Sequence, residues 1–212
     1  PRRDVLEHVW AKSPQRGQLA GERLSAHTGQ VLQRLAGFRD RYPALARRGA
    51  REDLFHLAGW AVLLHDLGKS ARGFQQMLRG GPPFPYRHEV LSLVAVGRLD
   101  VDEATRGLIA AGVGTHHKDA SWIQREYPAP SAASAREELL AELAGEDEAA
   151  WADWLAGRGA PNLEKLGFAP LPPLVARDRL PALAKSLGAL KALADALQEE
   201  AATSPLALTV RS

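Results

Sequence analysis

Histidine and aspartate side chains that can bind a metal ion recur through the first 120 residues of the chain. In order along the sequence they are His27, His65, Asp66, His88, His116 and His117. A single adjacent pair is weak support for a metal site, but two adjacent pairs with single histidines before and between them form a specific pattern. The chain has no cysteine, which excludes thiolate zinc sites, iron–sulfur clusters, disulfides and thiol nucleophiles. Any metal chemistry must therefore rest on imidazole and carboxylate groups.

The mixture of donors indicates which metal ions the site would take and how many. Imidazole with carboxylate favours Mn, Fe, Co, Ni or Zn over an all-oxygen magnesium or calcium site, with Mg as an alternative. Six candidate ligands exceed what one catalytic zinc ion uses. We therefore predict two divalent ions bridged by Asp66, with a single ion as the second choice. A two-metal centre suits hydrolysis of a phosphodiester or a phosphomonoester, because it activates water and holds the attacking and leaving oxygens.

Lys69 is the candidate catalytic cation beside Asp66. It is predicted to lie next to the metal ligands, where an ammonium group would hold a phosphate oxygen. The alternative is an ordinary cation near a helix C-terminus. The tripeptide Gly68-Lys69-Ser70 also resembles the end of a P-loop, but that motif requires glycine at the position of Leu63. We therefore exclude ATP binding by this segment.

The elements that must position these residues are helices. Apolar residues recur at helical spacing along most of the chain, and no alternating strand pattern is apparent, so the predicted fold class is all-α, a helical bundle. The expected helices cover residues 22–38, 51–67, 70–79, 88–98, 102–113, 134–144, 147–157 and 181–200. Gly68 is predicted to cap the second of these helices, and the Gly- and Pro-rich residues 80–85 are predicted to form a loop.

The candidate ligands fall at or near the ends of the expected helices. His27 is predicted to project from the apolar face of its helix. His65 and Asp66 follow a continuous apolar run, so they lie at a buried helix end where the carboxylate needs a partner such as a divalent cation. His116 and His117 follow a glycine-containing helix end. Where a helix frays, two adjacent side chains can converge on one site.

The composition is that of an ordinary globular domain. The 212 residues are 45% hydrophobic and 25% charged, with a net charge of +2. Residues 1–120 carry 18 basic and 12 acidic side chains, whereas residues 121–212 carry 9 and 13, so the first part is better suited to face phosphates. We predict a single domain over residues 1–212, with a core near residues 20–120 joined by C-terminal helices. Residues 122–173 are predicted to form a polar, Pro-rich helical insertion with a solvated, acidic surface.

The chain shows no sign of membrane insertion or export. The longest apolar run, Leu57 to Leu64, is too short to span a membrane, and the N-terminal residues lack the apolar region of a signal peptide. We therefore expect a cytoplasmic protein. The sequence begins with Pro1, and its only methionine is Met77. We expect it to be a piece of a longer chain.

Several segments, taken in order, resemble the HD-domain metal hydrolases, which are named for the His-Asp doublet seen here as His65-Asp66. The closer resemblance is to the HD nuclease of the CRISPR-associated helicase-nuclease family, the DNA-degrading effector of type I systems. The segments that carry it are Leu24 to Val31 around His27, Leu63 to Lys69, Gly73 to Gln75, Arg87 to Ser92, and His116-His117. The ordered set is far more specific than any one segment.

The resemblance implies a nuclease that hydrolyses single-stranded DNA with metal-activated water. It implies that Lys69 contacts the scissile phosphate and that the metal ligands are His27, His65, Asp66, His88, His116 and His117. The implied partners are a superfamily 2 helicase, in the same or a separate chain, and the CRISPR RNA-guided surveillance complex. Family members also use a later aspartate, for which Asp195 and Asp178 are candidates unless the true residue lies beyond Ser212.

Two other functions fit parts of the pattern. An HD phosphohydrolase acting on nucleotides or cyclic dinucleotides would use the same metal chemistry in a closed pocket, and a noncatalytic helical interaction module would hold the histidines as structural residues. His56 is predicted to be a core residue or to support a ligand, and His8 has no assigned role. Trp122, Trp151 and Trp154 are predicted to pack in the core, with base stacking as the alternative.

Overall fold

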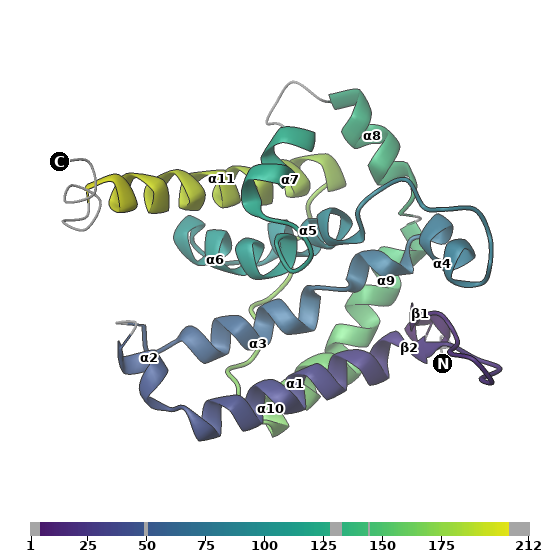
Figure 1. Cartoon of the computed structure of the whole chain (residues 1–212), viewed down its shortest axis with the longest axis horizontal. Helices are drawn as coiled ribbons and strands as arrows, with labels where there is room; N and C mark the ends of the chain where they lie inside the picture. Colours follow the sequence, from purple (N-terminus) through teal and green to yellow (C-terminus); the bar gives the residue numbers. More distant parts are fainter. Residues whose placement is uncertain (1–4, 49–50, 128–132, 144, 204–212) are drawn as a thin grey trace.

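The computed structural model is a bundle of helices with one small sheet at its N-terminal end (Figure 1). It describes residues 5–48, 51–127, 133–143 and 145–203. The α-helices are α1 (Leu24–Arg41), α2 (Ala44–Arg48), α3 (Leu54–Leu64), α4 (Arg72–Leu78), α5 (His88–Arg98), α6 (Glu103–Gly114), α7 (Ala120–Glu126), α8 (Ala133–Ala141), α9 (Gly145–Trp154), α10 (Ala160–Lys165) and α11 (Arg179–Thr203). This architecture confirms the predicted all-α class.

Helix α5 lies at the centre of the bundle. Every residue from His88 to Gly97 is buried, and α11, α6 and the 3-10 turn η2 (Leu67–Ser70) pack against the helix. Gly97 permits the close approach of α11, because a Cβ there would overlap the carbonyl oxygen of Ala182. The Ser186 hydroxyl of α11 also donates to the Leu93 carbonyl at 2.8 Å. Any site residue on α5 is therefore held in the most deeply buried part of the fold.

The turn after α3 differs from the prediction. Helix α3 ends at Leu64 rather than near residue 67, and Gly68 lies inside η2 instead of capping α3. The predicted capping role of Gly68 is therefore wrong. A Cβ at this position would overlap the His88 carbonyl oxygen, and the Gly68 N–H donates to Ser92 Oγ at 2.9 Å. Glycine is needed here because η2 lies directly against α5.

A small antiparallel sheet precedes α1, where no strand was expected. Strand β1 (Trp10–Lys12) pairs with β2 (Glu22–Arg23), with Trp10 opposite Arg23 and Lys12 opposite Glu22. Strands this short carry no detectable alternation of apolar and polar residues. Helix α1 consequently begins at Leu24, and Glu22 lies on the strand that leads into it.

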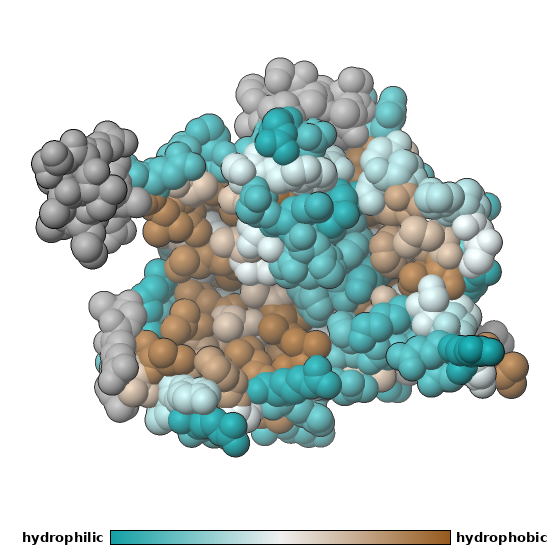
Figure 2. Space-filling view, viewed as in Figure 1, coloured by the Kyte–Doolittle hydropathy of each residue, from teal (hydrophilic) through white to brown (hydrophobic). Residues whose placement is uncertain are grey.

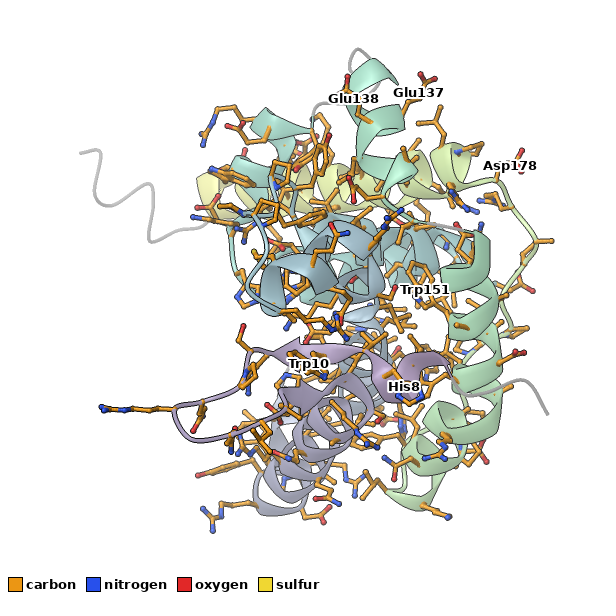
Figure 3. All side chains as sticks on the ribbon, turned by 90° about the vertical axis from the view of Figure 1, so that its right-hand side faces the viewer. His8, Trp10, Glu137, Glu138, Trp151 and Asp178 are labelled. Carbon is orange, nitrogen blue, oxygen red and sulfur yellow. The ribbon has the colours of Figure 1, made fainter. Side chains whose placement is uncertain are left out.

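The Pro-rich segment over residues 122–173 has an exposed acidic side and a buried apolar side. Glu137 and Glu138 of α8 are exposed at the edge of the molecule (Figure 3). Trp151 and Trp154 of α9 are buried, and Trp151 Nε1 donates to Ser70 Oγ at 2.9 Å. Other buried apolar residues of the segment are Leu139, Leu140, Leu143, Leu155, Leu163 and Phe168. The described acidic residues Glu137 and Glu138 are thus solvated as expected, and the apolar side of the segment packs into the main core.

Three short helices, α2, α7 and α10, are not among those predicted. Asp119 caps α7 by accepting a hydrogen bond from the Trp122 N–H at 2.7 Å. Pro161 of α10 follows the π-helical turn Leu155–Gly159, which joins α9 to α10 without a break, so the chain stays helical past this proline. The helical character predicted for this Pro-rich segment thus extends beyond the expected helix over residues 147–157.

Hydrophobic residues are unevenly distributed over the face of the molecule seen in Figure 2. Figure 2 shows a broad brown surface over α6 and α3 on the left, whereas the middle of the view is mainly hydrophilic and a smaller brown patch lies on the right. None of the described helices is both long enough and apolar enough to cross a membrane.

Candidate metal centre

Asp66 lies at the centre of the candidate ligands, between α3 and η2. Its side chain is only 2% exposed. His27 Nε2 and His65 Nε2 lie 3.5 and 3.2 Å from Asp66 Oδ2. On the other side of the carboxylate, His88 Nε2 and His116 Nε2 lie 3.2 and 3.6 Å from Oδ1. One buried carboxylate therefore faces four imidazoles, two on each oxygen.

His65 and His116 are held by the same local structure at two helix ends. His65 directly follows α3, and its Nδ1 lies 2.7 Å from the Val62 carbonyl oxygen three residues earlier. His116 follows α6, and its Nδ1 lies 2.6 Å from the carbonyl oxygen of Val113, again three residues earlier. A carbonyl can only accept, so Nδ1 carries the proton in both rings. Each Nε2 is thereby left with a lone pair directed toward Asp66.

The Nδ1 atoms of His27 and His88 lie near carboxylates instead of backbone carbonyls. His27 Nδ1 lies 3.4 Å from Glu22 Oε1, and His88 Nδ1 lies 3.4 Å from Glu89 Oε2. Glu89 is fully buried and accepts a hydrogen bond from Arg87 Nε at 2.6 Å. Neither glutamate was among the predicted site residues. For Glu89 a signal was available, since it directly follows a candidate ligand; for Glu22 the contact depends on the strand before α1.

The ligand atoms form two groups that meet at Asp66. We call His27, His65 and Asp66 the His27 group, and His88, His116 and His117 the His88 group. Within each group one ligand atom per residue lies within 4.8 Å of the others. His117 is the more exposed member of its group, and its ring centroid lies 4.2 Å from that of His116 and 5.1 Å from that of His88. All six predicted ligands are therefore brought together.

Three buried polar atoms that face one another, Asp66 Oδ1, His88 Nε2 and His116 Nε2, have no hydrogen-bond partner among the described residues, and neither has Glu89 Oε2 beside the His88 ring. Buried polar atoms are normally paired, because an unpaired one carries its full desolvation cost. The three atoms face one another, and all are electron-pair donors once Nδ1 holds the histidine proton. This donor set fits a divalent cation.

Burial and the facing imidazoles set the charge states at the centre. Burial raises the pKa of Asp66, but its contacts with the facing histidines, His116 foremost, hold that pKa far below the usual range of a carboxyl group. Burial lowers the pKa of His27, His88 and His117. These residues therefore stay neutral at pH 7 while Asp66 is ionised, which are the forms that bind a metal ion.

Lys69 places a positive charge against the same carboxylate. Its side chain is buried, with Nζ 2.8 Å from Asp66 Oδ2. Gln75 of α4 holds the backbone at this point, because its Nε2 donates to the carbonyl oxygens of Lys69 at 2.7 Å and of Trp10 at 2.9 Å. Strand β1, η2 and α4 are thus tied together beside the ligands.

The two candidate aspartates from the C-terminal part are not brought to the centre. Asp195 is exposed on α11 and pairs with Lys191 one turn earlier. Asp178 is exposed in the segment before α11 and lies at the edge of the molecule (Figure 3). Neither belongs to the His27 group or the His88 group.

The other histidines and tryptophans take mainly structural positions. His56 Nδ1 accepts a hydrogen bond from the Ala169 N–H at 2.9 Å, which agrees with the predicted core role, and His8 is exposed. Trp151 and Trp154 are buried, as predicted for packing residues. Trp122 is only partly buried.

A buried His-Asp doublet at a helix end, with histidines from three other positions converging on its carboxylate, defines a metal-dependent hydrolase of the HD type. The chain belongs to the Cas3 HD-domain family, since the family described as "Cas3, HD domain" matches residues 10–197. The match confirms the resemblance found in the sequence and places the chain among the CRISPR-associated HD hydrolases, which bind divalent metal ions. No curated protein and no solved structure matches the chain.

Proposed function

We propose that the chain is a nuclease that hydrolyses phosphodiester bonds of single-stranded DNA in type I CRISPR interference. The observation that carries the proposal is the position of Asp66, whose two oxygens face two separate groups of imidazoles. Membership of the Cas3 HD family supports the reaction and its setting. In that setting a superfamily 2 helicase, in the same or a separate chain, supplies single-stranded DNA at the surveillance complex.

The proposed centre binds two divalent ions. The His27 group would hold one ion and the His88 group the other, and the Asp66 carboxylate would serve both. The imidazole-rich donor set favours Mn, Co, Ni or Fe, with Mg and Zn as alternatives. When bound, the ions supply an activated water and positive charge for the phosphoryl oxygens.

The protein groups have separate tasks in this proposal. Asp66 stays ionised and contributes the negative charge between the two groups. The Nε2 atoms of His65 and His116 are directed inward, because Val62 and Val113 carbonyls accept from their Nδ1 side, and Glu22 and Glu89 lie beside Nδ1 of His27 and His88. The Lys69 ammonium, beside Asp66 Oδ2, would hold a non-bridging phosphate oxygen.

A cleavage assay with Asp66→Ala tests the proposed function. The unsubstituted chain loaded with Mn, Co or Ni should cut labelled single-stranded DNA, and Asp66→Ala should lower the rate by roughly a thousandfold or more, because both ions lose a ligand. Asp178→Ala is the matched control, since Asp178 is exposed and away from both groups. Circular dichroism shows whether each variant is folded.

Two results would contradict the proposal. They are undiminished cleavage in EDTA, and a folded Asp66→Ala variant as active as the unsubstituted chain. Free nucleotides and cyclic dinucleotides serve as competing substrates in the same assay. Hydrolysis of these compounds without cleavage of DNA would instead favour an HD nucleotide phosphohydrolase.

A further inference from the structure

A groove along α11 opens beside two of the proposed metal ligands. Its volume is about 620 Å³, within the range of ligand-binding sites. His116, His117 and Lys118 line it at the connection between α6 and α7. The α11 wall is apolar and consists of Leu190, Leu193, Ala194 and Leu197. The groove is therefore continuous with the metal centre and offers apolar contact area next to it.

Lys118 supplies the positive charge of this groove. It directly follows His117, is exposed, and its ammonium nitrogen lies 5.5 Å from the ring centroid of Trp122. A cation over an indole ring is held in place by electrostatic attraction. Arg87 also lies over this ring, at 5.7 Å, but its guanidinium is hydrogen-bonded to the buried Glu89. Among the described residues that line the groove, Lys118 is thus the exposed lysine or arginine, and it directly follows the candidate ligand His117.

Two other polar side chains of the groove make hydrogen bonds within the protein, and the exposed Asp119 is also the one carboxylate among the described lining residues. The Thr115 hydroxyl donates to the Ala111 carbonyl at 2.6 Å. Asp119 Oδ1 accepts hydrogen bonds from the Trp122 N–H and the Ser121 hydroxyl, both at 2.7 Å. Few polar groups therefore remain to read the edge of a nucleobase. A ligand here would be bound through apolar contact on one side and through its negative charge on the other.

We propose, resting on the proposed function, that this groove binds the nucleoside adjacent to the scissile phosphate of single-stranded DNA. Its base and sugar pack against Leu193 and Leu197 of α11, and Lys118 holds the neighbouring phosphate. Trp122 is a positioning residue that keeps the Lys118 ammonium at the rim. Because base edges meet few donors or acceptors, binding tolerates any base.

Oligonucleotide binding without cleavage tests this assignment. Fluorescence anisotropy of a labelled short thymidine oligonucleotide is measured with the 212-residue chain in EDTA, so that no cleavage interferes. Lys118→Ala and Leu197→Glu should each raise Kd by roughly tenfold. Leu197 is 56% exposed, so glutamate there does not disturb the core. Lys165→Ala and Leu19→Glu, at exposed positions away from α11, are the matched controls and should leave Kd unchanged.

The possible outcomes distinguish failure of the groove proposal from failure of the proposed nuclease function. Unchanged Kd in both groove variants, equal weakening by the control variants, or no binding by the unsubstituted chain overturns the groove assignment. A large difference in Kd between thymidine and adenosine oligonucleotides would contradict the proposal that the groove binds any base. If the groove variants weaken binding while the Mn-loaded chain cuts no DNA, the groove stands and the proposed nuclease reaction fails.

Discussion

The two ligand groups share Asp66 but are built from different parts of the fold. The His88 group draws on the buried helix α5 and the end of α6, and Phe74 packs on the His88 ring with centroids 5.0 Å apart. The His27 group depends on α1, whose histidine has its Nδ1 near Glu22 on the small N-terminal sheet. Core packing supports the first group, whereas a short peripheral hairpin supports the second. We therefore expect the His88 group to be the better preorganised of the two.

The position of the Lys69 charge also favours metal binding by the His88 group over the His27 group. The Lys69 ammonium lies 2.8 Å from Asp66 Oδ2, the oxygen that faces His27 and His65. Asp66 Oδ1, which faces the His88 group, is left without a hydrogen-bond partner in the described part of the chain. A cation bound by the His27 group would share its carboxylate oxygen with Lys69, and like charges in a buried site repel. The His27 group should therefore bind its ion more weakly.

Among the single substitutions that test this comparison, His88→Ala should cause the largest loss of bound metal. The substitution removes the most buried imidazole of the tighter group, so only the weaker His27 group remains complete. After dialysis against metal-free buffer, the variant should retain almost no metal, and DNA cleavage should fall by roughly a thousandfold. Elemental mass spectrometry measures the retained metal. Retention of one firmly bound ion per chain would show that the order of affinities is reversed.

His27→Ala should have a smaller effect on metal content. The His88 group is intact in this variant, so one ion should survive the same dialysis. Cleavage should still fall by about a hundredfold, because the second ion is missing. A His27→Ala chain that loses all its metal would mean that the two groups bind their ions only together.

Lys69→Ala should have the smallest effect on metal content and should change it in the opposite direction. Removing the ammonium frees Asp66 Oδ2, so the affinity of the His27 group should rise by about tenfold. Cleavage should nonetheless fall, since the phosphate loses its contact with Lys69. Metal titration followed by calorimetry measures the first effect, with Lys165→Ala as the control. Unaltered affinity and unaltered cleavage would assign Lys69 a purely structural role.

The sequence singled out residues that the fold does bring together, because the chemistry of the candidate ligands resides in residue type and order. Histidine pairs at helix ends were sufficient to select His65, Asp66, His116 and His117 without any tertiary information. The groups beside their Nδ1 atoms were harder to predict. The contact of Glu22 with His27 requires the two-stranded sheet, whose strands are too short to leave a pattern in the sequence.

Gly68 and Asp195 lie in surroundings that local sequence did not indicate, and the physical cause is the same for both. Gly68 satisfies a local rule for a helix cap, but its actual requirement is the contact with α5, a helix twenty residues later in the chain. Asp195 has the right residue type on a helix, yet tertiary packing leaves it exposed and paired with Lys191. Local sequence indicates what a residue can do, whereas packing of distant elements decides whether it does so.

The central claim is that Asp66 joins the two groups into one two-metal centre, and metal stoichiometry tests it most directly. The unsubstituted chain and Asp66→Ala are equilibrated with Mn, and the bound metal per chain is measured by equilibrium dialysis with elemental mass spectrometry. We predict two ions per chain for the unsubstituted protein and less than one for Asp66→Ala, with Asp178→Ala retaining two. A single ion in the unsubstituted protein, or two ions retained by Asp66→Ala, would contradict the account.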